Sequence, residues 1–422
     1  MDYGTMILPN GKHYSLDDKK TRINNNVMVV GTTGSAKTRT MVVPNLMECH
    51  GSYIVTDPKG NLYNRYGKYM KERGYRVKRL SFIHPEKSVH YDPMAYVETT
   101  QEMQQLSSLL ASHTQGKNND PYWEDSALIL FNSIIGLIKE GRKADMPFKG
   151  FNDIITLLRF AGKKECTNIS ALNEMMEELY KKNPKSWAYR QYRGIAQAPE
   201  KTHNCTVTTA LTKLNTLDTN ELIGMLSRDE IDIKSIGKRK TAIFVEISDT
   251  DRSMDILANI FFTQAMSQLC RFADEECENN ELPVPVRFIM DDFATNCRID
   301  NFDNMISNIR SRKISVMIIL QSLKQLEKGY EKNAHTIIDD CDTLVYMGGN
   351  DPETAGQIAL RVNKTTTTIL HMPLCTSWII RRGEKPVMCS NFELDDYLKK
   401  KEAELNYRCL PAPAGINGSL SR

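Results

Sequence analysis

The chain has 422 residues, of which 41% are hydrophobic and 25% are charged, and its formal net charge at pH 7 is +3. This composition is typical of a globular protein and excludes a disordered or fibrous chain, while the length predicts more than one domain. The nearly balanced charge neither supports nor excludes nucleic-acid binding, which would depend on local basic patches. The ten cysteines are scattered without Cys-x-x-Cys spacing, which predicts buried thiols rather than a metal site.

Residues 1–96 alternate between apolar strands and helical segments. The turn Pro9-Asn10-Gly11-Lys12 predicts a short hairpin or an extended entry near the start. Apolar runs at 27–30, 51–57 and 76–82 predict strands, and 61–73 predicts a helix. This alternation indicates an α/β fold with a mostly parallel central sheet, of which residues 1–96 form the first part.

The pattern changes to helical spacing in residues 97–230. Helices are predicted at 101–115, 123–140, 151–161, 168–182 and 200–217. We therefore expect an inserted all-α domain. Its aromatic and basic run Trp187-Ala188-Tyr189-Arg190-Gln191-Tyr192-Arg193 either contacts nucleic acid by charge and stacking or forms a solvated helix face.

Residues 231–410 return to strands and predict the second part of the α/β domain. The strands are expected at 241–247, 286–291, 314–320 and 343–347, with an edge hairpin at 377–381 and 385–390. The Pro- and Gly-rich residues 411–422 predict a flexible tail. No apolar run is long enough to cross a bilayer, and the first residues do not form a signal peptide, so we expect a soluble chain.

The stretch Gly31-Thr32-Thr33-Gly34-Ser35-Ala36-Lys37-Thr38 follows a strand and precedes a helix, as a P-loop does. Its backbone N–H groups and the helix N-terminus would bind phosphates, Lys37 would reach the β and γ phosphates of ATP, and the Thr38 hydroxyl would bind Mg²⁺. Ala36 stands where glycine is usual, and its methyl group is tolerable only if the backbone avoids positive φ. The alternative is a Gly/Ser/Thr turn that contains a lysine by chance, against which the flanking strand and helix argue.

Two acids, Asp291 and Asp292, end an apolar strand in the form of a Walker B motif. Asp291 would hold Mg²⁺ through its water shell, and Asp292 could orient or deprotonate a water that attacks the γ-phosphate. The alternative role for this pair is a helix N-cap. The upstream P-loop favours the catalytic interpretation.

Gln321 and Arg310 flank the strand expected at 314–320. Gln321 would reach the same sheet edge, where its amide could hydrogen-bond the γ-phosphate or the attacking water, or simply cap the strand. Arg310 belongs to the basic cluster Asn308-Ile309-Arg310-Ser311-Arg312-Lys313. It either complements a helix dipole or is a finger that stabilises the transition state in a neighbouring subunit. Both interpretations stay open at this point.

Together these motifs resemble the TraG/TraD class of type IV secretion coupling proteins, the conjugative DNA-transfer ATPases. The resemblance runs from about residue 20 to residue 390. It rests on the P-loop, Asp57-Pro58-Lys59-Gly60, Asp92-Pro93-Met94, Tyr122-Trp123-Glu124-Asp125, Asp291-Asp292 and Gln321-Ser322-Leu323-Lys324-Gln325-Leu326. The Asp-Pro-Lys-Gly and Gln-Ser-Leu elements are much more specific than the P-loop.

The resemblance implies a RecA-like nucleotide-binding domain with an all-α insertion that contacts the substrate or relaxosome. It also implies a homo-hexamer that delivers relaxase-bound single-stranded DNA to a secretion channel at the cytoplasmic face of the cell membrane. Other type IV secretion ATPases and channel subunits are then expected partners. By position it assigns Lys37 and Thr38 to phosphate and Mg²⁺, Asp291 to Walker B, Gln321 to motif III and Arg310 to the arginine finger.

Three departures from the family pattern are visible. Ala36 replaces glycine, Asp292 replaces glutamate and so withdraws its carboxylate by one methylene, and an N-terminal membrane anchor is missing. We expect either a fragment of a longer protein or a variant recruited by a membrane partner, able to exist as a monomer in isolation. Two other functions stay open: a nucleotide-binding docking receptor with little turnover, and another hexameric RecA-like DNA translocase, against which the helical insertion argues.

Overall fold

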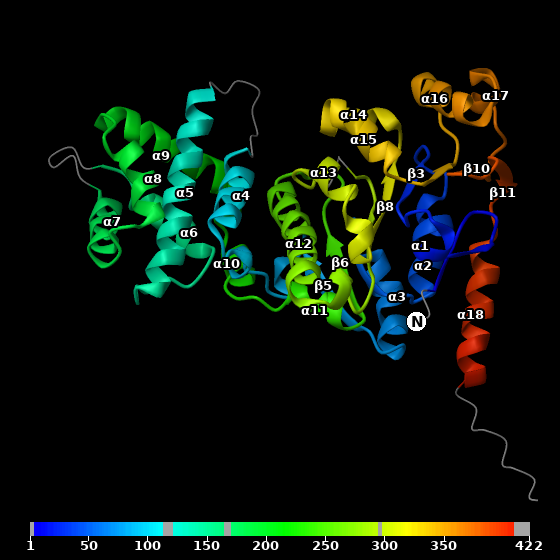
Figure 1. Cartoon of the computed structure of the whole chain (residues 1–422), viewed down its shortest axis with the longest axis horizontal. Coiled ribbons are helices and arrows are strands. Elements are labelled where there is room, and N and C mark those ends of the chain that lie inside the picture. Colours follow the sequence, from blue (N-terminus) through cyan, green and yellow to red (C-terminus); the bar gives the residue numbers. More distant parts are fainter. Residues whose placement is uncertain (1–3, 113–120, 164–169, 294–297, 409–422) are drawn as a thin grey trace, which may run out of the picture.

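A nine-stranded sheet forms the centre of the computed structural model, which describes residues 4–112, 121–163, 170–293 and 298–408, the last seven of these as backbone only. Its strands are β3 (Val27–Val30), β4 (Ser52–Thr56), β5 (Arg76–Ser81), β6 (Thr241–Glu246), β7 (Val286–Met290), β8 (Ile314–Leu320), β9 (Thr343–Tyr346), β10 (Thr376–Arg381) and β11 (Val387–Ser390). They lie in the order β11-β10-β9-β3-β8-β7-β4-β6-β5 (Figure 1). The strands from β9 to β5 run parallel, and the hairpin β10–β11 extends one edge antiparallel. The predicted α/β fold with a mostly parallel sheet is confirmed.

Both faces of the sheet are covered, which explains why its central strands are rich in apolar residues. Strands β3, β4, β6 and β7 are buried at every position. In β3, Val27 and Val29 pack into one hydrophobic cluster, and Met28 and Val30 pack into another on the opposite face. Such burial on both faces is the rule for parallel sheets flanked by helices.

The first face is covered by α2 (Val43–Met47), α3 (Asn61–Glu72) and α18 (Leu394–Arg408), together with the predicted hairpin of β1 (Thr5–Ile7) and β2 (His13–Ser15). The second face is covered by α11 (Ile233–Lys238), α12 (Asp255–Glu276), α13 (Phe302–Ile306), α14 (Leu323–Tyr330), α15 (Ala334–Asp339), α16 (Pro352–Val362) and α17 (Thr366–Leu370). Short turns complete this part, namely α1 (Asp18–Thr21), η1 (Thr38–Val42), η2 (Pro85–Lys87), η3 (Pro93–Tyr96), η5 (Glu278–Asn280), η6 (Ile309–Arg312) and η7 (Glu331–Asn333).

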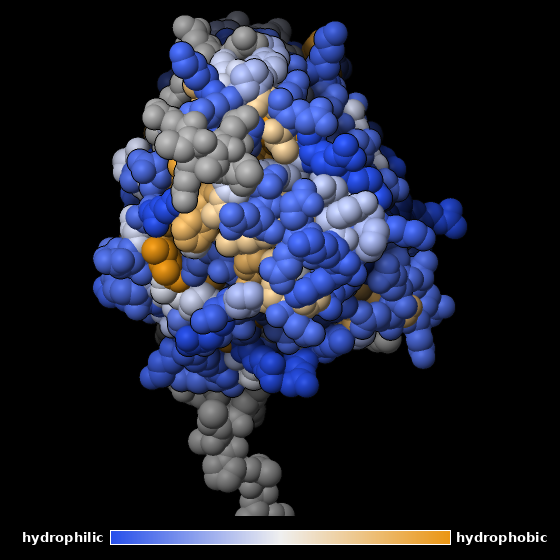
Figure 2. Space-filling model, turned by 90° about the vertical axis from the view of Figure 1, so that its left-hand side faces the viewer, coloured by the Kyte–Doolittle hydropathy of each residue, from blue (hydrophilic) through white to orange (hydrophobic). Residues whose placement is uncertain are grey.

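A separate group of helices lies to one side of the sheet (Figure 1). It consists of α4 (Thr100–Ala111), α5 (Pro121–Lys143), α6 (Asn152–Arg159), α7 (Ala171–Lys182), α8 (Trp187–Ala196), α9 (Glu200–Leu214), η4 (Asn215–Leu217) and α10 (Asn220–Met225). The described parts of 97–230 contain no strand. The end of this group that faces away from the sheet is mostly hydrophilic (Figure 2).

The aromatic and basic run predicted in this group lies on α8, and its aromatic rings are used in packing. Tyr192 is buried, and the Tyr189 ring stacks on the Tyr180 ring at 4.4 Å between centroids. Arg190 and Arg193 remain exposed. This arrangement favours a solvated basic helix face over a stacking platform for bases.

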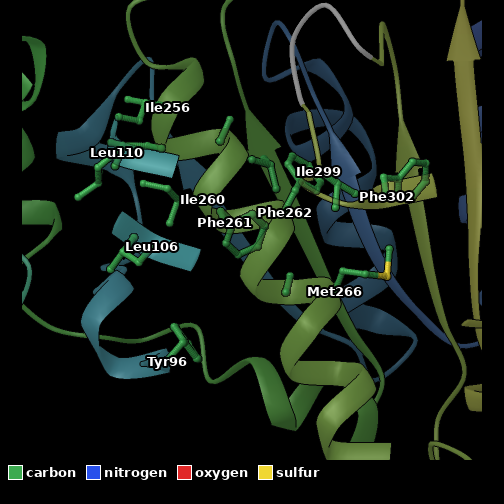
Figure 3. Close-up of a cluster of buried hydrophobic side chains, with 14 of the residues drawn as sticks. Tyr96, Leu106, Leu110, Ile256, Ile260, Phe261, Phe262, Met266, Ile299 and Phe302 are labelled. Carbon is green, nitrogen blue, oxygen red and sulfur yellow. The ribbon is translucent and has the colours of Figure 1, made fainter. Parts of the chain in front are cut away.

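Helix α12, which the sequence pattern did not predict, connects the helical group to the sheet. Figure 3 shows Ile256, Ile260 and Phe261 on the side of α4, where Leu106 and Leu110 lie, and Phe262 and Met266 on the opposite side. Because apolar side chains surround this helix, the sequence lacks the one-sided periodicity that identifies an amphipathic helix. Among the described residues, none of the helices has the length and apolar character needed to span a bilayer. The tail expected at 411–422 lies outside the described residues.

Candidate nucleotide-binding site

Three neighbouring strands bring the predicted motifs to one edge of the sheet. Strand β3 lies beside β8, and β8 lies beside β7. The P-loop follows β3, Gln321 follows β8, and Asp291 and Asp292 follow β7. Since the strands are parallel, these segments meet at their carboxyl ends, where open α/β sheets bind ligands.

The P-loop is tied to the ends of both strands that flank β3. The Gly31 amide donates to the Leu320 carbonyl at 3.1 Å, and the Thr32 amide donates to the Gly348 carbonyl at 3.0 Å. A Cβ on Gly31 would lie 2.5 Å from Ser35 Oγ and 3.0 Å from Met347 Cβ, so a larger residue would have to displace the Ser35 side chain. Ser35 Oγ is buried and has no hydrogen-bond partner within the described structure, which leaves a polar atom available inside the loop.

Ala36 corrects the expectation that its backbone avoids positive φ. Its φ is +63°, in the left-handed region that glycine normally occupies at this position of a P-loop. The methyl group is therefore accommodated with backbone strain rather than by a change of loop shape. Left-handed backbone destabilises an L-residue by roughly 1–2 kcal/mol.

The helix after the loop starts with a wide turn, and the sequence explains why. Residues Thr38–Val42 form a π-helical turn, η1, before α2 continues as a regular helix. The Val43 amide donates to the Thr38 carbonyl, whereas Pro44 has no amide hydrogen to bond the carbonyl four residues before it. The proline thus removes one regular helical bond just where the wide turn lies.

The Lys37 side chain folds back onto the backbone of the P-loop. Its Nζ donates to the carbonyl oxygens of Gly31 at 2.6 Å and of Thr32 at 3.1 Å. Burial lowers the pKa of Lys37, and the nearby Asp291 and Asp292 carboxylates oppose this effect. A phosphate group placed in the loop would give this ammonium a charged partner in addition to the two carbonyls.

Thr38 and Asp291 meet as the two predicted Mg²⁺ ligands. Thr38 Oγ1 donates to Asp291 Oδ2 at 3.0 Å, and the Asp291 amide donates to Thr56 Oγ1 at 2.6 Å. Mg²⁺ prefers hard oxygen ligands about 2.1 Å away in an octahedron, which puts adjacent ligands about 3 Å apart. Burial raises the pKa of Asp291, and the Asp292 charge raises it further. A cation bound beside Asp291 would offset both of these effects. The oxygen donors, their separation and this electrostatic environment all fit Mg²⁺.

Asp292 and Gln321 are also brought together. Gln321 Nε2 donates to Asp292 Oδ1 at 3.1 Å, and the Gln321 amide donates to Gln325 Oε1 at 2.8 Å. Asp292 has a left-handed φ of +50°, and its amide donates to Asp291 Oδ1 at 3.1 Å. The two side chains thus form one polar pair beside the P-loop.

Sequence reasoning missed three residues that position this site: Thr56, Gln325 and Gly348. Thr56 holds the Asp291 amide, Gln325 holds the Gln321 backbone, and the Gly348 carbonyl anchors the P-loop. Thr56 ends β4 and Gly348 lies two residues after β9, and both strands are next to motif strands, a signal that strand order alone would have revealed. Gln325 lies four residues after Gln321, one helical turn along α14.

Arg310 is not part of this cluster. It lies in η6, before β8, whereas Gln321 follows the seven residues of β8. A strand of that length spans about 20 Å, which places Arg310 at the amino edge of the sheet. Its Nε donates to Asp18 Oδ2 at 3.0 Å and its Nη2 donates to the Asp18 carbonyl at 3.1 Å. Arg310 therefore does not act on the P-loop of its own chain in this conformation.

Two further motifs of the sequence, at Asp57 and Asp92, hold backbone segments in place. The Asp57 carboxylate lies at the carboxyl edge of the sheet and accepts from the Tyr63 amide at 2.8 Å, so it caps the start of α3. Asp92 Oδ1 accepts from the Met94 amide at 3.0 Å and from the Phe151 amide at 3.1 Å, which joins the sheet part to the helical group. Burial raises the pKa of Asp92 to about 6.

Comparison with known proteins identifies relatives over most of the chain. The model of the family "Type IV secretory system Conjugative DNA transfer" matches residues 3–372. Protein VirD4 of Rhizobium radiobacter is 23% identical over 355 residues, covering 80% of this chain and 48% of that protein. Protein VirD4 of Rhizobium rhizogenes is 22% identical over 353 residues, covering 80% and 49%. The chain spans about half the length of these curated relatives.

Solved structures show the same fold at low identity. The bacterial conjugative coupling protein TrwBdeltaN70, in a trigonal form with sulphate, gives a TM-score of 0.69 at 14% identity, covering 93% of this chain and 90% of that chain. VirB4 of Thermoanaerobacter pseudethanolicus gives a TM-score of 0.56 at 11% identity, covering 92% and 97%. The fold, the sheet-edge cluster and the family match agree, and the chain belongs to the conjugative DNA transfer family of type IV secretory systems.

Proposed function

We propose that this chain is the nucleotide-binding part of a coupling ATPase of a conjugative type IV secretion system. It would recruit relaxase-bound single-stranded DNA and drive its delivery to the secretion channel by ATP hydrolysis. The observation that carries this proposal is the meeting of four side chains beside the P-loop, namely Thr38, Asp291, Asp292 and Gln321. The alternative of another RecA-like translocase loses support, because the family match extends across the helical insertion.

The solved relatives support ATP and Mg²⁺ as the ligands. The plasmid coupling protein TrwB has been solved with the ATP analogue ADPNP and with ADP and Mg²⁺. In this chain the P-loop amides and Lys37 would hold the phosphates, and Thr38 with Asp291 would hold the cation. Mg²⁺ supplies positive charge to the phosphate oxygens when it is bound there.

The pair of Asp292 and Gln321 is proposed to act on the attacking water. Asp292 can accept a proton or a hydrogen bond from the water, and the Gln321 amide can hold it in line with the γ-phosphate. Lys37 would offset negative charge on the phosphate in the transition state. Each of these groups stands at the carboxyl edge of the sheet, so no large rearrangement is needed to bring them together.

Arg310 is proposed to serve a neighbouring subunit. It sits at the opposite sheet edge from its own P-loop, so only a second copy, as in the expected homo-hexamer, could use its guanidinium at a γ-phosphate. In that assembly Arg310 must leave the carboxylate of Asp18. We also propose residues 97–230 as the domain that contacts the relaxosome, and the cytoplasmic face of the membrane as the place of action.

A docking receptor with little turnover is the second candidate. The observation that favours it is the geometry of Asp292, whose short side chain is held by Gln321 and whose backbone is left-handed. A carboxylate fixed in this way reaches less far toward a nucleotide than the glutamate usual in the family. Tight ATP binding without hydrolysis would result.

The test is the steady-state ATPase rate against protein concentration, with and without single-stranded DNA, for the wild type, Lys37→Ala and Asp292→Glu. A coupling ATPase with shared sites predicts a rate that rises faster than linearly with concentration, increases with DNA and is lost in Lys37→Ala. Tight ATP binding without turnover, restored by Asp292→Glu, would identify the docking receptor. An ATPase rate that is linear in protein concentration, and that neither DNA nor Lys37→Ala changes, would contradict both candidates.

A further inference from the structure

A small cavity lies at the amino edge of the sheet, on the opposite side from the nucleotide site. It is bordered by the starts of β7 and β8 and has a volume of about 50 Å³. Among the side chains that line it are Asp18, Tyr53, Arg287, Arg310, Lys313 and Ser315. Basic groups outnumber acidic ones in this set.

Arg287 is the unusual member of the lining. It is the second residue of β7 and only 7% exposed. Its Nε donates to Ser315 Oγ at 3.1 Å, and within the described parts of the chain it has neither another hydrogen bond nor an ion pair with a carboxylate. An arginine guanidinium stays protonated in proteins, so this is a buried positive charge without a counter-ion. Buried charges are normally paired, and this one lines a cavity.

The other two basic side chains of this set, Arg310 and Lys313, each have an acidic partner. Arg310 Nε pairs with Asp18 Oδ2 at 3.0 Å, and Lys313 Nζ pairs with Glu281 Oε2 at 2.7 Å. Glu281 also pairs with Lys19 Nζ at 2.8 Å, so both acids are already occupied by cations. The charge that remains uncompensated is that of Arg287, and an anion is what would complete the cavity.

The size of the cavity limits what that anion can be. A water needs roughly 10–15 Å³ of such volume, so about 50 Å³ holds about four water-sized groups. A tetrahedral oxyanion, four oxygens around one central atom, has this size, whereas a nucleoside does not fit. The terminal nitrogens of Arg287 and the hydroxyl hydrogen of Ser315 are donors suited to its oxygens.

We propose that this cavity is a second anion site that binds free inorganic phosphate, or sulfate of the same shape, with Arg287 as its main ligand. Asp18 and Arg310 line the same cavity, so the bound anion would lie beside them. It would compete with Asp18 for the Arg310 guanidinium and so change the charge presented at this edge. The site is separate from the P-loop and does not depend on whether the chain hydrolyses ATP.

The test must remove the P-loop as a competing phosphate site, so every protein carries Lys37→Ala. Phosphate binding is measured by isothermal titration calorimetry at constant ionic strength in chloride buffer. Arg287→Met should weaken it about tenfold or more, because hydrogen bonds from a charged donor are lost. Arg65→Met, which removes an exposed arginine of α3, is the matched control and should leave binding unchanged. A single-stranded oligonucleotide and ATP should not compete with phosphate for this site.

Ser315→Asp provides an independent variant. Its carboxylate would stand beside Arg287 and act as an internal anion, so this variant should be folded, more resistant to heat than its parent, and unable to bind phosphate. Without phosphate, Arg287→Met should also be at least as stable as its parent, because an uncompensated buried charge is gone. Equal phosphate affinity in the parent, Arg287→Met and Ser315→Asp would overturn the proposal, as would the absence of phosphate binding in the parent. Displacement of phosphate by the oligonucleotide would assign the site to nucleic-acid phosphates instead.

Discussion

Ala36 of the P-loop has a left-handed backbone conformation, and this gives a prediction for stability. The sign of the expected change depends only on that backbone conformation. Replacing Ala36 by glycine removes the strain of a φ of +63°, which is worth roughly 1–2 kcal/mol. The same change lets the unfolded chain adopt more conformations, which opposes the gain by about 0.4–1 kcal/mol. We therefore expect Ala36→Gly to stabilise the protein by about 0.5–1 kcal/mol.

Ala95→Gly is the matched control, since the chemical change is identical and the conformation is not. Ala95 is exposed in the right-handed turn η3 and is not among the residues with positive φ. Glycine there brings only the entropic penalty, so the variant should lose about 0.5–1 kcal/mol. The two variants should therefore differ from the wild type in opposite directions.

Equilibrium unfolding in urea, followed by circular dichroism, measures both changes. The midpoint should rise for Ala36→Gly and fall for Ala95→Gly, with unchanged slopes. If Ala36→Gly destabilises the protein as much as Ala95→Gly does, the left-handed assignment of the loop is wrong. Ala36→Val adds a functional check, because a β-branched residue is a clear outlier at positive φ and should abolish nucleotide binding.

Three further predictions concern the proposed catalytic pair of Asp292 and Gln321 and two titrating carboxyls. Gln321→Leu should lower the ATPase rate about tenfold to hundredfold with nucleotide affinity within about twofold, as measured by steady-state kinetics and titration, because Asp292 and the water lose a donor. Asp92 has a pKa raised to about 6, so its contribution to stability falls as pH rises from the ordinary Asp range of about 4 through 6. Asp92→Asn, which keeps an acceptor for the Met94 and Phe151 amides, should flatten this part of the urea-midpoint profile. Glu48 has a pKa lowered to about 2 by His50, Lys401 and Tyr397 despite its burial, so its stabilisation is complete above about pH 4.5 and is lost as pH falls through 2. Glu48→Gln should lose about 2 kcal/mol at pH 7, and its unfolding midpoint should approach that of the wild type near pH 2.

The fold was predictable where local patterns agree with tertiary burial. The strand at 27–30 is apolar at every position and the strand at 286–290 is apolar except at Arg287, because both faces of the sheet are covered, and these runs are visible in the sequence. Helix α12 was not predictable, because it is buried on the sides of both α4 and the sheet, so its apolar residues are not confined to one face. Periodicity detects a helix at a surface, and it fails for one that lies between two layers.

The site shows a similar division. Lys37, Thr38 and Asp291 were predictable because the chemistry of a phosphate and a cation fixes the residue types and their spacing. The left-handed conformation of Ala36 was not, since alanine gives no signal for it. The side of β8 on which Arg310 lies follows from the sequence, but its contact with Asp18 does not, because Asp18 is 292 positions away along the chain.

The two edges of the sheet have opposite chemical character, and this bears on how copies would meet. The carboxyl edge presents Asp291 and Asp292 and would hold the negative phosphates, whereas the amino edge carries Arg287, Arg310 and Lys313. A head-to-tail contact, in which one copy's amino edge faces the next copy's carboxyl edge, is the kind of interface that closes a ring. With a net charge of only +3, the total charge would provide little drive for such a contact, so in the proposed assembly the difference between the edges would have to provide it. In an isolated copy Asp18 neutralises Arg310, which explains why turnover by the proposed ATPase should depend on assembly rather than on the single chain.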